Sequence, residues 1–436
     1  MRSSKQKFSI RVAALAALVL SVAAASGCGG SGSSSKNTGG GSNTQVIASP
    51  GPNVAPLTVD EGPAQLQTLY GAAYLNGVFV TVNVCLPGTS TCQTIDHVLV
   101  DTGSIGLRLL DISSFGEFDR TKVPLVQEKD SNNNPIAECV QFVDGSFLWG
   151  GVATADVKLS GETASNVPVH IVGDTTFTGS NPVPAKCSVN GTNADTLQHL
   201  GTNGILGVGN LQQDCPGCVV VAGTPPPEPF YYTCPNGVCS ASFATLTEQV
   251  QNPVALFATD NNGVIVELPS VGSSGAPSIP MGNGALVFGI GTQSNNALGS
   301  ASVLTLDSFL NINVSFKGTS YPASFIDSGS NALFFSDNAT TGMPPCPIDG
   351  PSFYCPSSPQ NFTGTNQGAN GTSTTTNFTI VSLDSQPAAN FVFNNVGGPG
   401  SSHSFDWGLP FFMGRNVFVS IAGKTAPGGT PPYVAY

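Results

Sequence analysis

The amino-acid sequence predicts an all-β protein made of two related halves that meet at one site. The first observation is a repeated motif: Asp-Thr-Gly-Ser at 101–104 follows the apolar run 98–100, and Asp-Ser-Gly-Ser at 327–330 follows 324–326. The second is the composition, because 52 glycines, 33 prolines and only 9% charged residues are typical of short strands joined by many turns. Two carboxylates in the same local frame suggest a pair that shares one proton.

The first 27 residues are predicted to be a signal peptide. Basic residues up to Arg11 precede the apolar run 12–25, which is too short to span a bilayer as a permanent helix. Small residues at 25–27 then precede Cys28, a pattern that resembles a bacterial lipobox, although leucine is commoner than Ala25 at its position. We expect cleavage before Cys28 and lipidation of that cysteine. The alternative is an ordinary signal peptide with Cys28 merely near the cleavage site.

Residues 28–58 are predicted to form a tether between the lipid and the folded body. This stretch is rich in Gly, Ser, Asn and Pro and has almost no charge. Such a linker has a reach of about 30 Å for roughly 30 residues. Gly29 follows the cysteine, which resembles the signal for outer-membrane retention. We therefore expect a lipid-anchored protein of the bacterial cell envelope, at the outer membrane.

The cysteines also predict export. Of 11 cysteines, ten remain after Cys28, and most of them stand in close pairs that an oxidising compartment converts to disulfides. The predicted disulfides are Cys85–Cys92, Cys139–Cys187 and Cys346–Cys355, while the cluster Cys215, Cys218, Cys234 and Cys239 can pair in more than one way. Zinc binding by this cluster is the alternative, disfavoured by the spacing of its second pair and by the compartment.

Charge and histidine content exclude several other classes. The net charge is −12 with a pI near 4.5, and no basic cluster follows the signal, so nucleic acid is not expected as a partner. The four histidines form no metal-binding motif. His97 precedes Asp101 by four residues, but no nucleophile elbow accompanies it. We expect no metal, no cofactor and a monomer that contacts the membrane only through its lipid.

Two further elements complete a family pattern. Ile-Leu-Gly at 205–207 follows the first motif, and Asp-Trp-Gly at 406–408 with an apolar stretch over 409–418 follows the second. With them, about residues 70–425 resemble the pepsin-like aspartic peptidases, in which an apolar-apolar-Gly element crosses beneath each Asp-Thr/Ser-Gly loop. The match is looser at 406–408.

The resemblance implies a bilobal pepsin-like acid-protease fold, with two pseudo-twofold-related, barrel-like β lobes and the active cleft between them. The N-terminal lobe is expected over 59–245 and the C-terminal lobe over 246–436. Residues 75–84 match the first-lobe hairpin, 284–289 the interlobe strand, and 304–326 the strands that lead to the second motif. Insertions at 210–240 and 336–377 are expected to be surface decoration.

The resemblance also implies a role for each motif residue. Asp101 and Asp327 are the expected catalytic pair, one taking a proton from water and the other donating to the scissile carbonyl. The expected supporting residues are Thr102 and Ser328, which lock the two loops together, Gly103 and Gly329, which admit backbone N–H groups, and Ser104 and Ser330, which bond the outer carboxylate oxygens.

A hairpin over 141–159 stands where the family has its flap, and Phe142, Asp144 and Gly145 are the candidate flap residues. The family's flap tyrosine is missing. Its tryptophan after the first motif is missing too, since Leu-Arg-Leu at 107–109 stands there.

The predicted function is that of an aspartic endopeptidase acting on peptides or unfolded proteins in the interlobe cleft. The alternative is a catalytically inactive binding or scaffold lipoprotein on the same fold, which the altered flap favours. A structural cell-surface β-protein with chance motifs is a third hypothesis.

Overall fold

The computed structural model describes residues 6–8, 45, 47–178, 183–189 and 191–436. The lipidation site Cys28, the predicted signal peptide apart from 6–8, and most of the predicted tether therefore lie outside the described residues. Strand β1 (Gln6–Phe8) pairs in parallel with β3 (Ala72–Tyr74). Among the described residues, no helix has the length and apolar character needed to cross a membrane.

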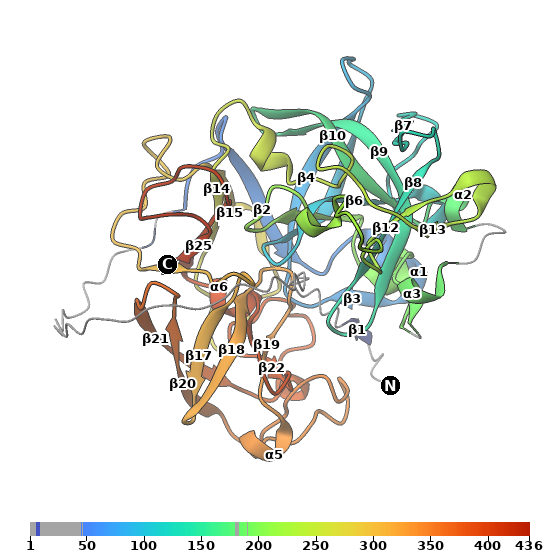
Figure 1. The fold of residues 1–436 in the computed structure, drawn as a ribbon. Helices are drawn as coiled ribbons and strands as arrows, with labels where there is room; N and C mark the ends of the chain where they lie inside the picture. Colours follow the sequence, from blue (N-terminus) through green and yellow to red (C-terminus); the bar gives the residue numbers. More distant parts are fainter. Residues whose placement is uncertain (1–5, 9–44, 46, 179–182, 190) are drawn as a thin grey trace.

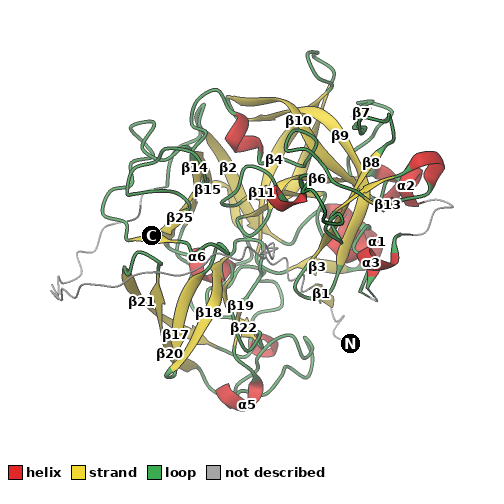
Figure 2. Cartoon of the chain, viewed as in Figure 1, coloured by secondary structure: helices red, strands yellow, loops and turns green. Residues whose placement is uncertain are grey.

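The N-terminal half forms an upper lobe, blue to green in Figure 1, in which strands outnumber the short helices and are joined by long loops (Figure 2). Its strands are β2 (Val54–Asp60), β4 (Gly77–Cys85), β5 (Cys92–Asp101), β6 (Ile105–Leu110), β7 (Val126–Gln127), β8 (Ile136–Gln141), β9 (Phe147–Leu159), β10 (Glu162–Val172), β11 (Gly204–Val208), β12 (Tyr231–Thr233) and β13 (Ser240–Ala241). Its helices are α1 (Ala64–Tyr70), α2 (Thr175–Thr178), α3 (Ala185–Ser188) and α4 (Leu197–Leu200), with short 3-10 turns η1 (Ile112–Ser114), η2 (Pro216–Cys218), η3 (Pro235–Gly237) and η4 (Pro253–Leu256).

The C-terminal half adds a lower lobe, orange to red in Figure 1. The elements of the C-terminal half are β14 (Gly263–Leu268), β15 (Ile279–Phe288), β16 (Val303–Thr305), β17 (Ile312–Phe316), β18 (Thr319–Ile326), β19 (Leu333–Phe335), α5 (Asn338–Thr341), β20 (Gln360–Gln367), β21 (Ser373–Ile380), η5 (Leu383–Ser385), β22 (Gly397–Gly398), β23 (Phe405–Trp407), α6 (Leu409–Phe412), β24 (Arg415–Ser420) and β25 (Tyr433–Ala435). The seven strands from β17 to β23 form the sheet of the lower lobe, in the order β21-β20-β17-β18-β23-β19-β22.

A continuous sheet joins the two halves. Strand β2 pairs with β15, and β14, β24, β25 and β16 extend the same sheet beyond it, so C-terminal strands pair with the N-terminal segment. The predicted lobe boundary at 245/246 falls in the connection between β13 and η4 and stays a prediction.

The strand register reveals the internal duplication. In the upper lobe β5 pairs in parallel with β11, with Val100 opposite Leu206, and in the lower lobe β18 pairs in parallel with β23, with Ile326 opposite Trp407. Each of these strand pairs leads directly into one Asp motif. The predicted all-β fold of two duplicated halves is confirmed.

Aromatic side chains fill the core of the lower lobe. Phe335 stacks on Phe405 with ring centroids 4.9 Å apart, and Phe405 packs on Trp407 at 4.2 Å. Trp407 is fully buried and donates from Nε1 to Asn366 Oδ1 at 2.8 Å. Aromatic pairs of this kind stabilise a core beyond their buried area, which holds the strands leading to Asp327 in place.

Five disulfides lie within the described residues. The predicted Cys85–Cys92, Cys139–Cys187 and Cys346–Cys355 pairs form, and the remaining cluster pairs as Cys215–Cys218 and Cys234–Cys239. Because all four sulfurs of this cluster are oxidised, it offers no thiolate for zinc.

Three sequence-based expectations need correction. The tether does not extend to residue 58, because Gln45 donates to Leu268 O at 2.8 Å, the Ala48 amide donates to Glu267 at 2.7 Å, and β2 begins at Val54. The segment 210–240 is more than decoration, since its strand β12 pairs with β8. The segment 336–377 supplies β20 and the start of β21, and β20 pairs with β17.

Candidate active site

The two motif aspartates meet at the centre of the molecule. Asp101 is the last residue of β5, Asp327 directly follows β18, and both are fully buried. A Cβ added at Gly103 would lie 2.7 Å from Asp327 Cγ, and one added at Gly329 would lie 2.7 Å from Asp101 Oδ1. Each glycine therefore faces the other motif's carboxyl group, and only a residue without a Cβ allows this approach. The two carboxyl groups lie close enough for each to shift the pKa of the other.

A reciprocal set of hydrogen bonds holds the two loops together. The Thr102 amide donates to Ser328 Oγ at 3.1 Å, and the Ser328 amide donates to Thr102 Oγ1 at 3.0 Å. Each hydroxyl in turn donates across the interface, Thr102 to Ile326 O at 3.1 Å and Ser328 to Val100 O at 2.7 Å. Because each hydroxyl both donates and accepts, the small buried space between the loops leaves neither of them unpaired.

Thr102→Val is expected to destabilise the protein by about 1–3 kcal/mol. Valine matches threonine in shape but cannot accept from the Ser328 amide, which stays buried without that partner. The free energy of unfolding from urea titration measures this loss. Thr68→Val is the control, because its hydroxyl bonds only the exposed Ala64 carbonyl of α1. Equal stability of the two variants would show that the reciprocal hydrogen bonds of Thr102 and Ser328 do not stabilise the protein.

Further donors surround each carboxyl group. The Gly103 amide donates to Asp101 Oδ1 at 2.8 Å, and Ser104 Oγ donates to Asp101 Oδ2. The second motif repeats this arrangement, with Ser330 Oγ 2.9 Å from Asp327 Oδ2. The predicted supporting residues are thus all in place around the pair.

Burial and mutual repulsion keep a proton at this pair. Burial raises the pKa of Asp101, opposed by hydrogen bonds from Asp327, Ser104 and Gly103. The pKa of Asp327 is raised well above its usual value, first by burial and then by the charges of Asp101 and Asp406. Two carboxyls in contact cannot both ionise cheaply, so the pair carries one proton and one negative charge over a broad pH range.

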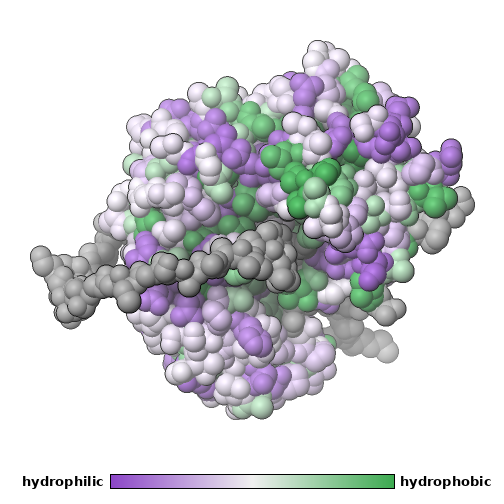
Figure 3. All heavy atoms as spheres, in the orientation of Figure 1, coloured by the Kyte–Doolittle hydropathy of each residue, from purple (hydrophilic) through white to green (hydrophobic). Residues whose placement is uncertain are grey.

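A cavity of about 310 Å³ lies beside the loop of the first Asp motif. Residues 102–105 line it together with the hairpin tip and with lower-lobe side chains, among them Leu306, Phe309, Ile312 and Phe325. Figure 3 shows hydrophobic atoms on the part of the upper lobe that borders the lower lobe. The cavity therefore offers apolar walls from both lobes next to the carboxyl pair.

The predicted flap residues lie at the tip of the β8–β9 hairpin. Phe142 is buried, and Phe142 and Val143 line the cavity. Asp144 shapes the turn by accepting from the Ser146 amide at 2.8 Å, and Gly145 adopts a φ of 86°, which glycine tolerates best. Of these three predicted residues, only Phe142 belongs to the cavity wall.

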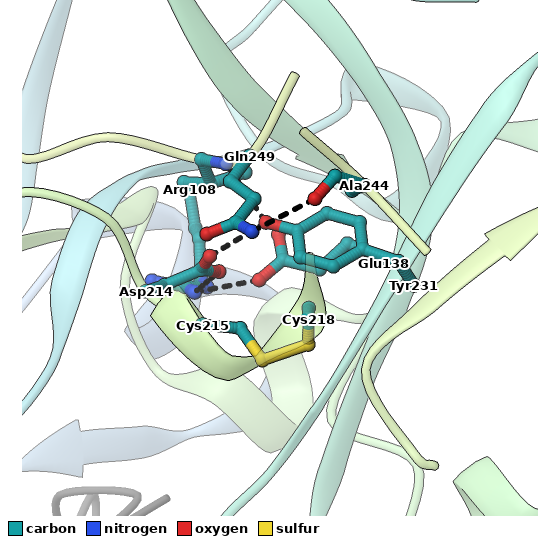
Figure 4. Close-up of a disulfide and its surroundings, with 9 residues drawn as sticks. Arg108, Glu138, Asp214, Cys215, Cys218, Tyr231, Ala244 and Gln249 are labelled. Carbon is teal, nitrogen blue, oxygen red and sulfur yellow. Dashed lines mark hydrogen bonds and ion pairs between the residues drawn. A yellow bond between two sulfur atoms is a disulfide. The ribbon is translucent and has the colours of Figure 1, made fainter. Parts of the chain in front are cut away.

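A buried ionic network forms part of the cavity lining, and the sequence did not reveal it. Figure 4 shows Arg108, Glu138, Asp214 and Tyr231 converging from separate segments. Arg108 lies 2.7 Å from Glu138 and 3.2 Å from Asp214, and Tyr231 donates to Asp214 at 2.6 Å. Arg108 lies on β6 and Glu138 lies on β8, so the network connects the β8–β9 hairpin to the strand after the first motif.

Charges within the network set its protonation. Burial opposes ionisation of Glu138, but the charge of Arg108 outweighs it and lowers the pKa of Glu138 to about 2. Burial, followed by the charge of Glu138, raises the pKa of Asp214 well above its usual value. His170 lies 3.1 Å from Glu138, yet burial lowers the pKa of His170 to about 4.

Tyr74 is a second residue that the sequence did not reveal. It is fully buried, and its hydroxyl has no hydrogen-bond partner among the described residues. Burial raises the pKa of Tyr74, and the nearby charges of Asp101, Asp327 and Asp144 raise it further. A phenol therefore lies near the carboxyl pair, although it comes from β3 and not from the flap.

His97 takes no part in the carboxyl pair. Its ring nitrogens lie 3.3 Å from Asp60 and 2.7 Å from Asp96. Burial opposes the charge, but these two carboxylates prevail and raise the pKa of His97 to about 9. The histidine is thus an ion-paired residue of strand β5.

Comparisons with known proteins give one family and a set of similar solved structures. Residues 49–436 match the protein family described as "Protein of unknown function (DUF3443)". No curated protein sequence matches the chain. Among solved structures, the chain is similar to the crystal structure of aspartic proteinase from Irpex lacteus, with 18% identity, a TM-score of 0.47, and coverage of 88% of this chain and 96% of that one.

Proposed function

This chain belongs to the DUF3443 family, and we propose that it is an aspartic endopeptidase that hydrolyses peptide bonds with a water activated between Asp101 and Asp327. The observation that supports this most is the close approach of two fully buried carboxyl groups, each hydrogen bonded to its own glycine amide and serine hydroxyl. A structural role would not require two costly carboxyls to face each other in a dry site.

The reaction follows from one shared proton. The ionised carboxylate takes a proton from water, which attacks the scissile carbonyl carbon, while the protonated carboxyl donates to the carbonyl oxygen. The fixed amides of Gly103 and Gly329 stabilise the carboxylate charge without reorganisation. The apolar cavity takes a side chain of an extended peptide, and the β8–β9 hairpin covers it.

We propose that the body is held at the outer membrane through lipid on Cys28. Substrates would then be peptides or unfolded proteins of the cell envelope. Radiolabelled palmitate should be incorporated into the chain expressed in a Gram-negative host, and Cys28→Ser should abolish both the label and recovery in the membrane fraction. Incorporation that persists in Cys28→Ser would contradict the anchor.

The test of the activity is a digest of an unfolded protein by the full chain between about pH 3 and pH 7. Cleavage should occur and should be blocked by pepstatin, whose hydroxyl occupies the place of the attacking water, but not by a metal chelator or a serine-directed reagent. If the folded chain with its disulfides formed cleaves nothing, the inactive binding protein becomes the better hypothesis.

A further inference from the structure

The two halves differ in one residue that lies next to the carboxyl pair. In the upper lobe Ile205 of β11 is opposite Leu99, two residues before Asp101. In the lower lobe Asp406 of β23 is opposite Phe325, two residues before Asp327. Asp406 therefore occupies the place that Ile205 has in the upper lobe. Both residues are buried, so a carboxyl group replaces an aliphatic side chain at one of two equivalent positions.

Asp406 is connected to Asp327 by a single hydroxyl group. Ser330 Oγ lies 2.9 Å from Asp327 Oδ2 and 2.7 Å from Asp406 Oδ2, and all three residues are buried. A serine hydroxyl has one hydrogen to donate. If both carboxyls were ionised, one of the two contacts would oppose two oxygens with no hydrogen between them. At least one of the two carboxyls must therefore hold a proton.

A proton on Asp327 satisfies both requirements of the site at once. First, it supplies the hydrogen missing between Asp327, Ser330 and Asp406: Asp327 donates to Ser330, and Ser330 donates to ionised Asp406. Second, it is the one proton that Asp101 and Asp327 share. We propose that Asp406 is a positioning residue that, through Ser330, assigns the shared proton to Asp327 and leaves Asp101 as the base. This inference rests on the proposed endopeptidase function.

The surrounding charges act in the same direction. The register places Arg108 beside Ile205 in the upper lobe and Phe334 beside Asp406 in the lower lobe. A cation thus stands near Asp101 and an anion near Asp327. Burial raises the pKa of both carboxyls; the charge of Arg108 opposes this rise at Asp101, whereas the charges of Asp101 and Asp406 add to it at Asp327.

The other titratable groups near the site do not change the assignment of the proton to Asp327. Tyr74 interacts with both catalytic carboxyls, and its raised pKa keeps it neutral across the working range. Glu138 and Asp214 are already paired with Arg108. Among the described residues, Asp406 is thus the acidic side chain that shares Ser330 with the pair.

Asp406→Asn is expected to move the alkaline limb of the pH profile of kcat/KM to lower pH by about one unit. Removing the negative charge lowers the pKa of Asp327, so the proton that Asp327 donates is lost at a lower pH. On the alkaline side kcat/KM then falls about tenfold relative to the parent protein at the same pH. Ser330→Ala interrupts the chain and should shift the same limb in the same direction.

Asp156→Asn is the matched control. Asp156 is also a buried strand aspartate, but it accepts from the Gly88 amide at 2.9 Å in the β4–β5 turn, on the β9 side of the upper lobe. The pH profile of kcat/KM in Asp156→Asn should match that of the parent protein. Asp406→Glu, which keeps the charge, should return the limb toward the parent position. An alkaline limb that stays in place in Asp406→Asn would overturn the proposal.

A titration independent of catalysis separates this proposal from the proposed function. Carbon-13 spectra of the full chain, labelled at aspartate Cγ, should contain a carboxyl that titrates well above the usual range and disappears in Asp327→Asn. In Asp406→Asn this signal should titrate about one pH unit lower. If it does so in a chain that cleaves nothing, the assigned proton stands and the endopeptidase function fails. If it does not move, the proposal fails whatever the activity.

Discussion

Asp101→Asn and Asp327→Asn are each expected to lower kcat/KM for peptide hydrolysis by about 10³-fold or more. Each removes one of the two groups between which the proton moves, and a positioned acid or base contributes about 10²–10⁴-fold by itself. Because the two act as a unit, the double variant should lose little more than either single one. Initial rates of cleavage of a fluorogenic peptide, measured across the pH range, give these values.

The same two variants should remain folded. The Oδ1 of asparagine can still accept from the amide of Gly103 or Gly329, and its Nδ2 can donate to the oxygen of the Ser104 or Ser330 hydroxyl. It also removes a buried carboxyl from beside another, which relieves repulsion. The midpoint of thermal unfolding should therefore be at or above that of the parent protein. Full activity in Asp101→Asn would show that the carboxyl pair is not the catalyst.

The sequence predicted the centre of this site because its geometry is local. Asp101 and Asp327 each end a strand, and the glycine and serine that follow bond the same carboxyl within three residues. Such short-range chemistry is visible in four consecutive letters. The reciprocal contacts of Thr102 and Ser328 follow from the duplication, because two equal loops can meet only about a twofold axis.

The ionic network could not be predicted in this way. Arg108, Glu138, Asp214 and Tyr231 come from four segments spread over more than a hundred residues, and each alone reads as an ordinary strand or loop residue. Their burial depends on how the cysteine-rich segment 210–240 folds against β8, which requires tertiary information. Without this tertiary information, the composition of segment 210–240 indicates only a surface insertion.

The β20–β21 hairpin was missed because its pattern is polar. Asn366 and Thr376 are buried there, and a sequence pattern based on hydrophobicity reads them as exposed. Asn366 is satisfied by the indole of Trp407 and by the Tyr436 hydroxyl, 2.6 Å away. Both partners lie far along the chain, so the sequence alone favoured a surface loop.

Arg108→Met is expected to destabilise the protein by about 3–5 kcal/mol. Removing one partner of a buried ion pair leaves the other charge uncompensated in a medium that solvates it poorly. Here Glu138 and Asp214 both lose the guanidinium, and the side chains of all three are almost completely buried. Chemical denaturation at pH 7 measures the change in the free energy of unfolding.

Arg108→Met should also weaken substrate binding, because Glu138 lies on the strand that leads to the hairpin tip at Phe142. A hairpin no longer held to β6 should raise KM more than it lowers kcat. Glu138→Gln in the Arg108→Met background should recover part of the stability, since it removes one of the uncompensated charges.

Arg120→Met provides the comparison for this effect. Arg120 also pairs with a buried carboxylate, Asp174, but its own side chain is 26% exposed, so water can replace much of what methionine removes. Its loss should cost about 0–1 kcal/mol. If Arg108→Met cost no more than Arg120→Met, the network would be an incidental contact and the flap would need another support. A clear difference would show that the buried ion pairs of Arg108 stabilise the packing of β8 against β6.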